Sequence, residues 1–370
     1  MPARTTQRTL PTGGFNRERT PRPLGVASGV PWEPRLAERD HAGATITSQF
    51  LEWLEHYPAL QGIGAAWTNV LHSLFVRDSY PAPTDTPDEP GAWKFAAIGD
   101  YGTGSVHQAR VAANILRRTP ELVLTVGDNV YPTGRWQDYA KNFDPPHLMG
   151  NLVRRVPFMP ALGNHDLYQD DLRPYFGHFP HLKGRPYYSY THKNAHFIAL
   201  DGDQDLRAGS AQLRWLEKEL QSSDKQWRVV YLHYPMYSSK GGFDEIRDAV
   251  QPLLKKYKVQ LVLAGHEHDY QRSHAIDGVT HVLTGGGGQQ VWNFTKKAPS
   301  FIAFRKAAYH HTEVSVSGTR LVVRAIDEGG KLIDSAVIPA SGTMQARMGV
   351  SQLSPSDRVT TGRQKKRRTA

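Results

Sequence analysis

Five short apolar stretches of this sequence each run directly into a polar side chain of a type that binds metal ions. They are AAIG before Asp100, LTVG before Asp128, FMPALG before Asn164, VVYL before His233 and LVLAG before His266. In open α/β sheets, functional side chains gather at the carboxyl ends of the strands. We therefore expect these five positions to meet at one edge of the fold. A single junction of this kind is weak evidence, but five in succession argue against a chance match.

The residue types at these junctions suit a particular class of metal ion. Carboxylate, phenolate, amide and imidazole groups together favour iron, zinc or manganese, and not calcium or copper(I). His266 and His268 are two residues apart on a predicted extended turn, where both side chains can point the same way. They could therefore reach two metal ions about 3.5–4 Å apart. One carboxylate can bridge such a pair, so the pattern favours a two-metal site.

From residue 93 onward the sequence predicts strands that alternate with helices, and then strands alone. Strands are expected at 93–98, 121–126, 156–161, 186–191, 195–200, 226–232 and 259–264, and again near 279–284, 309–316, 319–326 and 331–338. Helices are expected at 105–118, 210–222 and 244–257, with Ser210 as a capping residue. An α/β half followed by a β-rich half predicts two mixed sheets packed together, with helices outside.

The segments that flank this body are much more basic than the body itself. Residues 1–40 hold seven Arg against four acidic residues, and residues 341–370 hold seven basic residues against Asp357. The body is therefore close to neutral, and we expect no specific nucleic-acid partner. We predict a disordered basic tail at 1–40, a helical extension and linker at 41–91, the main domain at 92–340 and a second disordered basic tail at 341–370. The tails are candidates for contact with a polyanion or a partner.

The absence of three features limits the chemistry and the location that we expect. Cysteine is absent, which excludes disulfides, thiolate ligands and a cysteine nucleophile. No apolar run reaches about 18 residues, so we expect no transmembrane segment. The first 40 residues lack the apolar region of a secretory signal peptide. Together with the missing cysteine, this favours a cytoplasmic location.

Read together, the motifs at the strand ends resemble a known signature. GDYG, GDNVY, GNHD, VVYLH and GHEH match the five blocks of metallophosphoesterases, the calcineurin-like phosphoesterase superfamily. Tyr131, three residues after Asp128, is the mark of the purple acid phosphatases. The resemblance covers about 93–340 and is to the short, single-domain type. It implies an α/β fold, a four-layer α/β/β/α sandwich of two mixed sheets, and a dinuclear metal centre.

The resemblance also implies which residues bind the two metals. Iron(III) would be bound by Asp100, Asp128, Tyr131 and His268, and a divalent ion (iron, zinc or manganese) by Asp128, Asn164, His233 and His266. Asp128 would bridge the two ions. His165 would lie beside the phosphate, and Asp166 could orient His165 through a hydrogen bond. Charge agrees with this division, because two carboxylates and a phenolate suit a trivalent ion, whereas the other site has only neutral ligands apart from Asp128.

The function implied is that of an acid phosphatase. A metal-activated hydroxide would hydrolyse phosphate monoesters of small molecules without a covalent intermediate. One alternative is a dinuclear zinc or manganese phosphodiesterase or nucleotidase of the wider superfamily, against which Gly102 and Tyr131 argue. A second alternative is a non-catalytic scaffold, against which the complete ligand set argues.

The sequence departs from the purple family at one point. Members commonly carry a further histidine between the VxxH and GHxH blocks, but residues 237–245 read YSSKGGFDE. Lys240 and Asp244 are the candidates to replace that histidine, so the leaving-group acid and the pH optimum stay open. Farther along, GGGG at 285–288 is followed by no evident helix start. We therefore expect a tight turn near the rim of the site and not a phosphate-binding loop.

Overall fold

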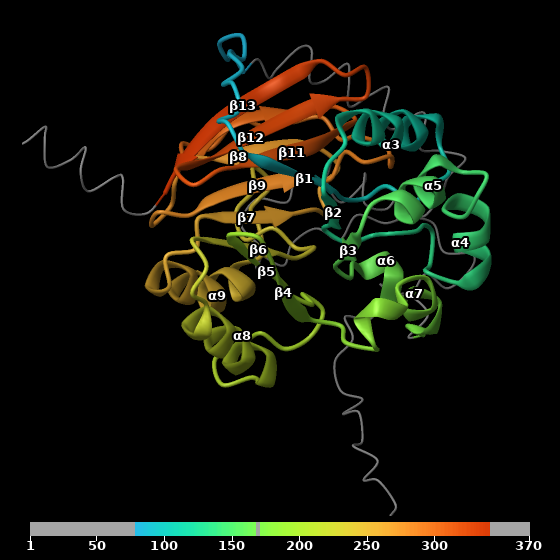
Figure 1. Cartoon of the computed structure of the whole chain (residues 1–370), viewed down its shortest axis with the longest axis horizontal. Coiled ribbons are helices and arrows are strands. Elements are labelled where there is room, and N and C mark those ends of the chain that lie inside the picture. The colour runs from blue at the N-terminus through green and yellow to red at the C-terminus, as the bar shows by residue number, and fades with distance from the viewer. Residues whose placement is uncertain (1–77, 168–170, 341–370) are drawn as a thin grey trace, which may run out of the picture.

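The computed structural model describes residues 78–167 and 171–340 (Figure 1). The helical extension predicted before residue 78 and both predicted tails lie outside the described residues. Within the described ranges, no helix has the length and apolar character needed to cross a membrane.

Two mixed β-sheets form the body of the molecule, as the sequence predicts. The first sheet runs, in spatial order, β13 (Leu332–Pro339), β12 (Arg320–Asp327), β11 (His310–Val316), β1 (Trp93–Ile98), β2 (Leu122–Thr125) and β3 (Phe158–Pro160). In it β1, β2 and β3 are parallel, while β11, β12 and β13 join β1 as an antiparallel meander. The parallel half therefore carries three of the predicted metal-binding junctions at one edge.

The second sheet has seven strands and carries the other two junctions. Its spatial order is β10 (Ile302–Lys306), β8 (Tyr270–Ser273), β9 (Thr280–Thr284), β7 (Leu261–Ala264), β6 (Trp227–Tyr231), β5 (Ala195–Ala199) and β4 (Tyr188–His192). Strands β5, β6, β7 and β9 are parallel, β4 and β8 run antiparallel to them, and the edge strand β10 pairs antiparallel with β8.

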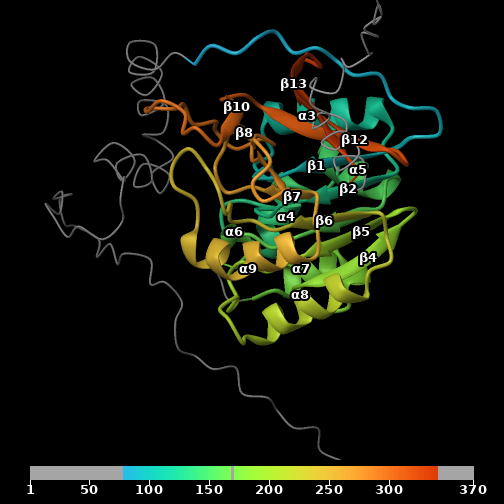
Figure 2. The same cartoon turned by 90° about the vertical axis from the view of Figure 1, so that its left-hand side faces the viewer.

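Helices cover the outer surfaces of the two sheets. They are α3 (Val106–Arg118), α4 (Trp136–Asn142), α5 (Leu148–Arg155), α6 (Asn164–Leu167), α7 (Arg173–His178), α8 (Ala211–Ser222) and α9 (Asp244–Lys256), with a short 3₁₀ turn, η1 (Pro180–Leu182). Figure 2 shows α8 and α9 against the outside of the seven-stranded sheet, while α3 contacts β11 of the other sheet. Helix α8 starts where the sequence predicts, because the Ser210 side chain accepts a hydrogen bond from the Leu213 amide.

The main core lies between the two sheets. Phe95 of β1 and Phe197 of β5 meet edge to face, with ring centroids 5.2 Å apart. A second apolar cluster fills the space between the seven-stranded sheet and its helices, and includes Val230, Leu216 and Val250. Burial on both faces explains why the central strands read as continuous apolar runs. The sheets and helices together confirm the predicted α/β fold.

An extended segment, residues 78–92, runs along the outside of the six-stranded sheet (Figure 2), and we call it the strap. The Arg324 guanidinium of β12 holds it through Asp85, at 2.6 Å, and Asp88, at 2.7 Å. Lys94 of β1 also contacts Asp88, at 3.1 Å. The part of the predicted linker that the structure describes is therefore packed against the sheet by ion pairs.

The elements that the sequence did not predict are short or lie at the edges of the fold. They are the helices α4 to α7 and the strands β8 and β10. None of these has more than eight residues, so no apolar period repeats often enough to be read from the sequence.

Candidate metal centre

The five predicted junctions converge where the carboxyl ends of the parallel strands of both sheets meet. Asp100 follows β1, Asp128 follows β2 and His266 follows β7, and all three have backbone φ angles in the left-handed region, at 55°, 51° and 71°. That conformation is uncommon for residues other than glycine, and it clusters at functional sites. At each of these three residues the backbone turns sharply after the strand. The turn directs the side chain into the space between the sheets.

The first group of donor atoms surrounds the Tyr131 hydroxyl. This hydroxyl lies 2.9 Å from Asp128 Oδ2, 3.4 Å from Asp100 Oδ1 and 3.4 Å from His268 Nε2. His268 Nε2 is also 3.6 Å from Asp100 Oδ1. Four side chains from three separate strand ends thus bring two carboxylates, a phenol and an imidazole together.

The second group of donor atoms surrounds the Asn164 side-chain oxygen. Asn164 Oδ1 is 3.0 Å from His233 Nε2 and 3.2 Å from His266 Nδ1. The two imidazole nitrogens are 3.3 Å apart, and His233 Nε2 is 3.4 Å from Asp128 Oδ1. This group therefore contains one amide oxygen and two imidazoles beside a single carboxylate.

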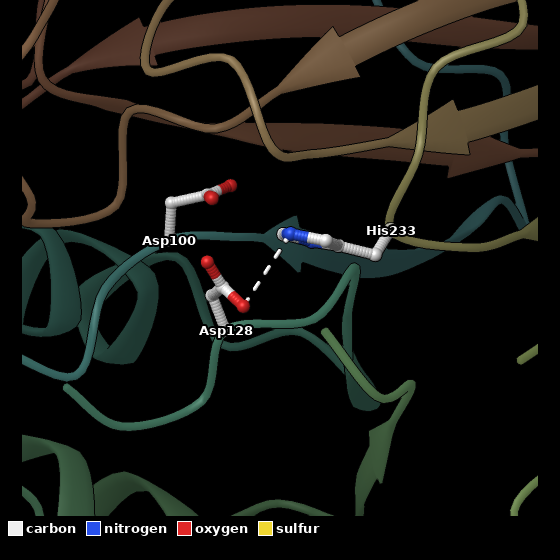
Figure 3. A group of neighbouring side chains, drawn as sticks. All are labelled: Asp100, Asp128 and His233. Carbon is white, nitrogen blue, oxygen red and sulfur yellow. Dashed lines mark ion pairs between the residues drawn. The ribbon is translucent and has the colours of Figure 1, made fainter. Parts of the chain in front are cut away.

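Asp128 belongs to both groups, one oxygen to each. Its Oδ2 faces Tyr131, whereas its Oδ1 faces His233. Figure 3 shows Asp128 between Asp100 and His233, whose ligand atoms all lie within 4.8 Å of one another. The carboxylate is thus placed to bridge two ions, one in each group of donors.

In two of the imidazoles, a backbone carbonyl determines which ring nitrogen faces the site. His233 Nδ1 lies 2.8 Å from the Val126 carbonyl oxygen, and His268 Nδ1 lies 2.9 Å from that of Gln290. Because each carbonyl accepts the proton of Nδ1, the lone pair is left on Nε2, which faces the site. Metal-binding histidines are commonly oriented in this way.

The electrostatics of the site fit a cation. Among the described residues, no lysine or arginine forms an ion pair with Asp100 or Asp128, both of which are buried. Burial raises the pKa of Asp100 well above its usual range, and the Asp128 carboxylate adds to the rise. Burial would lower the pKa of His233, but Asp128 raises it to about 10. A proton on His233 therefore supplies positive charge that a metal ion would otherwise bring, and the donor set suits such an ion.

His165 stands beside the first group of donors. Its backbone amide donates to Asp128 Oδ1 at 2.9 Å, and its ring lies 4.2 Å from that of Tyr131. Its Nδ1 is 2.8 Å from the carbonyl oxygen of Pro132, and Nε2 is 3.9 Å from Asp128 Oδ2. The Pro132 carbonyl therefore orients this ring.

Asp166 does not make the hydrogen bond to His165 that the sequence suggested. Its carboxylate accepts from the amides of Gly163, at 2.9 Å, and Asn129, at 3.1 Å, and from the Asn129 side chain, at 2.9 Å. His165 and Asp166 are consecutive residues of α6, and neighbours on a helix point in different directions. Asp166 instead ties the loop after β2 to the loop after β3, which are the loops of Asp128 and Asn164.

The glycine run at 285–288 lies within the site and not at a helix start. A Cβ on Gly285 would meet the Asp100 carboxylate and the Glu267 carbonyl, and one on Gly287 would meet the Gly99 carbonyl. The run follows β9 and contains bends but no helix, in agreement with the expected turn. Its glycines allow the chain to pass directly behind Asp100.

The two candidates for the missing histidine differ in their surroundings. Asp244, the first residue of α9, is exposed and pairs with Arg247 at 2.5 Å. Lys240 lies closer to the donor groups, with Nζ 3.5 Å from the buried Asp269 and 4.1 Å from the centre of the Trp292 ring. Trp292 in turn packs on His268, at 4.3 Å between ring centroids.

Sequence reasoning did not identify Trp292 or the carbonyls of Val126, Pro132 and Gln290. A carbonyl oxygen is present at every position, so nothing in a sequence marks the ones that orient a ligand. Trp292 lies on a loop between β9 and β10, and no motif places that loop against His268.

Comparison with known proteins assigns the class of the domain. Residues 94–270 match the family model described as calcineurin-like phosphoesterase. A phosphoenolpyruvate phosphatase of Allium cepa is 26% identical over 282 residues, which are 63% of this chain and 57% of that protein. A probable inactive purple acid phosphatase 27 of Arabidopsis thaliana is 26% identical over 259 residues, 57% of this chain and 41% of that protein. The chain thus spans about half the length of these relatives.

A solved structure supports the same fold. Purple acid phosphatase PPD1 from yellow lupin (Lupinus luteus) seeds superposes with a TM-score of 0.61 at 20% sequence identity, covering 69% of this chain and 55% of that one. Residues 94–270 therefore match the calcineurin-like phosphoesterase model, and the chain has the metallophosphoesterase fold. Within that class, its homologues include purple acid phosphatases.

Proposed function

We propose that this protein hydrolyses phosphate monoesters with the help of two metal ions. The observation that carries the proposal is the position of Asp128, whose two carboxylate oxygens face two separate groups of donor atoms. One relative is named a phosphatase and another a probable inactive one, so the family alone does not decide between catalysis and its loss. All seven proposed ligands are present in this chain, which favours catalysis.

The two donor groups suit ions of different charge. Asp100, Asp128 and Tyr131 supply anionic oxygen ligands, which favour a trivalent ion such as iron(III) beside His268. Asn164, His233 and His266 are neutral ligands and, with Asp128, favour divalent iron, zinc or manganese. When bound, such ions activate water for attack on phosphorus and neutralise charge on the phosphoryl oxygens.

The chain itself supplies orientation and a proton site. Because the Pro132 carbonyl holds the proton on His165 Nδ1, the other nitrogen faces the donor groups. We assign His165 Nε2 the role of contacting a phosphoryl oxygen or transferring a proton beside it. The His165 side chain is 16% exposed, so a substrate can reach it from solvent. Asp166 holds the loops of Asp128 and Asn164 together, because its carboxylate accepts hydrogen bonds from the amides of Asn129 and Gly163.

The deciding experiment measures metal content, visible absorption and hydrolysis on one sample of the full chain. We expect two bound metal ions, a tyrosinate-to-iron(III) absorption band and faster hydrolysis of p-nitrophenyl phosphate than of bis(p-nitrophenyl) phosphate. Tyr131→Phe should abolish the band. His165→Asn should lower kcat by about 100-fold while leaving the metal content unchanged.

Each alternative function predicts a different result. A colourless enzyme with two zinc or manganese ions and a preference for the diester would indicate the phosphodiesterase or nucleotidase. A protein that binds metal and hydrolyses neither ester would indicate a scaffold.

A further inference from the structure

The loop of residues 289–297, which we call the 292 loop, makes three contacts with His268. The Gln290 carbonyl oxygen lies 2.9 Å from His268 Nδ1, and the Trp292 amide donates to the His268 carbonyl oxygen at 3.0 Å. The Trp292 indole packs on the imidazole with ring centroids 4.3 Å apart. The loop thus contacts both the backbone and the ring of His268 and leaves only Nε2 toward the donor groups.

The other end of the 292 loop is fixed by a buried arginine. Arg305 of β10 is 3% exposed, and its guanidinium lies 4.2 Å from the Phe294 ring and donates to the Lys296 carbonyl oxygen. Its carboxylate partner is Asp78 at the start of the strap, with Nε 2.6 Å from Oδ2. One salt bridge therefore joins the strap to the loop that holds His268.

Lys240, in the connection between β6 and α9, makes a third contact with the 292 loop. Lys240 Nζ lies 4.1 Å from the centre of the Trp292 ring and 3.5 Å from Asp269 Oδ2. The cation is therefore held on the indole by a buried carboxylate, which restricts the position of Trp292 against His268.

From these contacts we propose that the 292 loop positions His268 as a ligand and that the Asp78–Arg305 pair fastens the loop. Asp78 and the loop both lie outside residues 94–270, the range that matches the family model. A residue of the strap, far along the chain from His268, therefore contributes to the metal site. Trp292 and Asp78 act through His268 and are positioning residues. The inference rests on the proposed function to the extent that His268 is a metal ligand.

The strap offers a matched control. Asp88, like Asp78, pairs with a nearly buried arginine, but that partner is Arg324 on the outside of the six-stranded sheet. Asp78→Asn and Asp88→Asn each remove one carboxylate charge from the same segment. Only the first should affect the 292 loop, whereas both should lower the thermal unfolding temperature.

The test uses the full chain as wild type and as the variants Asp78→Asn, Asp88→Asn, Trp292→Leu and Trp292→Phe. In metal-free protein, amide hydrogen exchange in residues 289–297 should quicken in Asp78→Asn and stay unchanged in Asp88→Asn. In titrations of the metal-free protein with Zn²⁺, which can enter both donor groups, Asp78→Asn and Trp292→Leu should weaken the affinity of the group that contains His268 by about tenfold. Trp292→Phe should restore part of the loss, and Asp88→Asn should bind Zn²⁺ as the wild type does.

Two results would overturn the inference. One is unchanged exchange of residues 289–297 in Asp78→Asn. The other is an equal Zn²⁺ affinity in Asp78→Asn, Asp88→Asn and the wild type, which would limit Asp78 to a role in stability. A wild-type chain that binds neither Zn²⁺ nor iron nor manganese would overturn the proposed function and the role of His268, whereas the exchange comparison would still decide whether Asp78 fastens the loop.

Discussion

Two of the buried clusters of charged side chains in the described part of the molecule are built in opposite ways. The outer cluster lies between the six-stranded sheet and the strap and centres on Glu313, which is 1% exposed. Its carboxylate lies 2.7 Å from Arg118 and 3.5 Å from Arg324, with Lys94 at 3.7 Å. In this cluster, each buried charge meets opposite charges that the chain itself provides.

The metal cluster is balanced only in part, by a proton on His233 beside Asp128. Asp100 and Asp128 face imidazoles and a phenol, and among the described residues neither pairs with lysine or arginine. A buried charge without a partner is costly, whereas a paired one is tolerated. The comparison shows that burial of charge alone does not mark a functional site. What marks it here is buried negative charge that the chain leaves for a cation to neutralise.

The sharpest test of this contrast is Asp100→Asn, because it should affect activity and stability in opposite directions. Loss of an anionic ligand should reduce hydrolysis by roughly 1,000-fold, or about 4 kcal/mol of transition-state stabilisation. The pKa of Asp100 is raised in the folded state, so its ionised form destabilises the metal-free protein at neutral pH. Asparagine removes that charge and tolerates the φ of 55°.

Metal-free Asp100→Asn should therefore unfold at a higher temperature than metal-free wild type. Calorimetry with and without Zn²⁺ checks this, since added metal should raise the unfolding temperature of the wild type much more than that of the variant. A variant that is less stable than the wild type without metal would contradict the idea that the site is balanced only in part.

In the outer cluster, Glu313→Gln should behave in the opposite way. It leaves Arg324 and Arg118 without their shared buried carboxylate, at a cost of about 3 kcal/mol in the free energy of unfolding. For a protein of this size, that corresponds to a fall of roughly 6–12 °C in the unfolding temperature. Zn²⁺ affinity should stay unchanged. A weakened affinity at equal stability would show that the two clusters are coupled.

The sequence predicts the polar side chains of the site better than the contacts that orient them. Asp100, Asp128, Asn164, His233 and His266 each follow an apolar strand, so a local pattern and the rule that parallel strands share an edge suffice to place them together. The two-residue spacing from His266 adds His268, and the resemblance to the purple acid phosphatases adds Tyr131 and His165. The strands and long helices follow from periodicity for the same reason, because the signal is local.

What the sequence could not supply depends on contacts between distant segments. The 292 loop reaches His268, and Asp78 reaches Arg305, only after both sheets have formed. The partner of Asp166 was mistaken because the prediction assumed an interaction between neighbours, whereas the turn of α6 separates their side chains. Strands β8 and β10 are only four and five residues long, too short for a clear sequence pattern, and β10 is the edge strand of its sheet.

Acid should lower the folding stability of the protein because of His311, which lies on the outer side of the six-stranded sheet. This residue of β11 is 1% exposed, and neither ring nitrogen has a hydrogen-bond partner among the described residues. Burial, together with nearby His310 and Arg118, lowers its pKa to about 3. The unfolded chain takes up a proton below pH 6.5 and the folded chain does not, so stability falls as the pH drops from 6.5 toward 3.

At pH 5 the loss from this one group is about 2 kcal/mol relative to neutral pH. His311→Phe should remove that loss and leave the unfolding free energy at pH 7.5 nearly unchanged. Denaturant unfolding at both pH values measures the difference. Equal pH dependence in variant and wild type would mean that His311 is protonated in the folded protein.

The smallest effect is expected at Asp244, which belongs to neither cluster. Its carboxylate is exposed and paired with Arg247 one helical turn away, so solvent screens its charge. Asp244→Asn should therefore change kcat/KM by less than about twofold and leave the acid limb of its pH profile in place. A shift of that limb would assign Asp244 to the leaving group.

Lys240→Met is the informative contrast, because Lys240 contacts the buried Asp269 and the Trp292 ring. If the rule drawn from the two clusters holds, the effect of removing a charge depends on how deeply its partners are buried. Lys240→Met should then alter the kinetics more than Asp244→Asn, although the two residues are only four positions apart in the sequence.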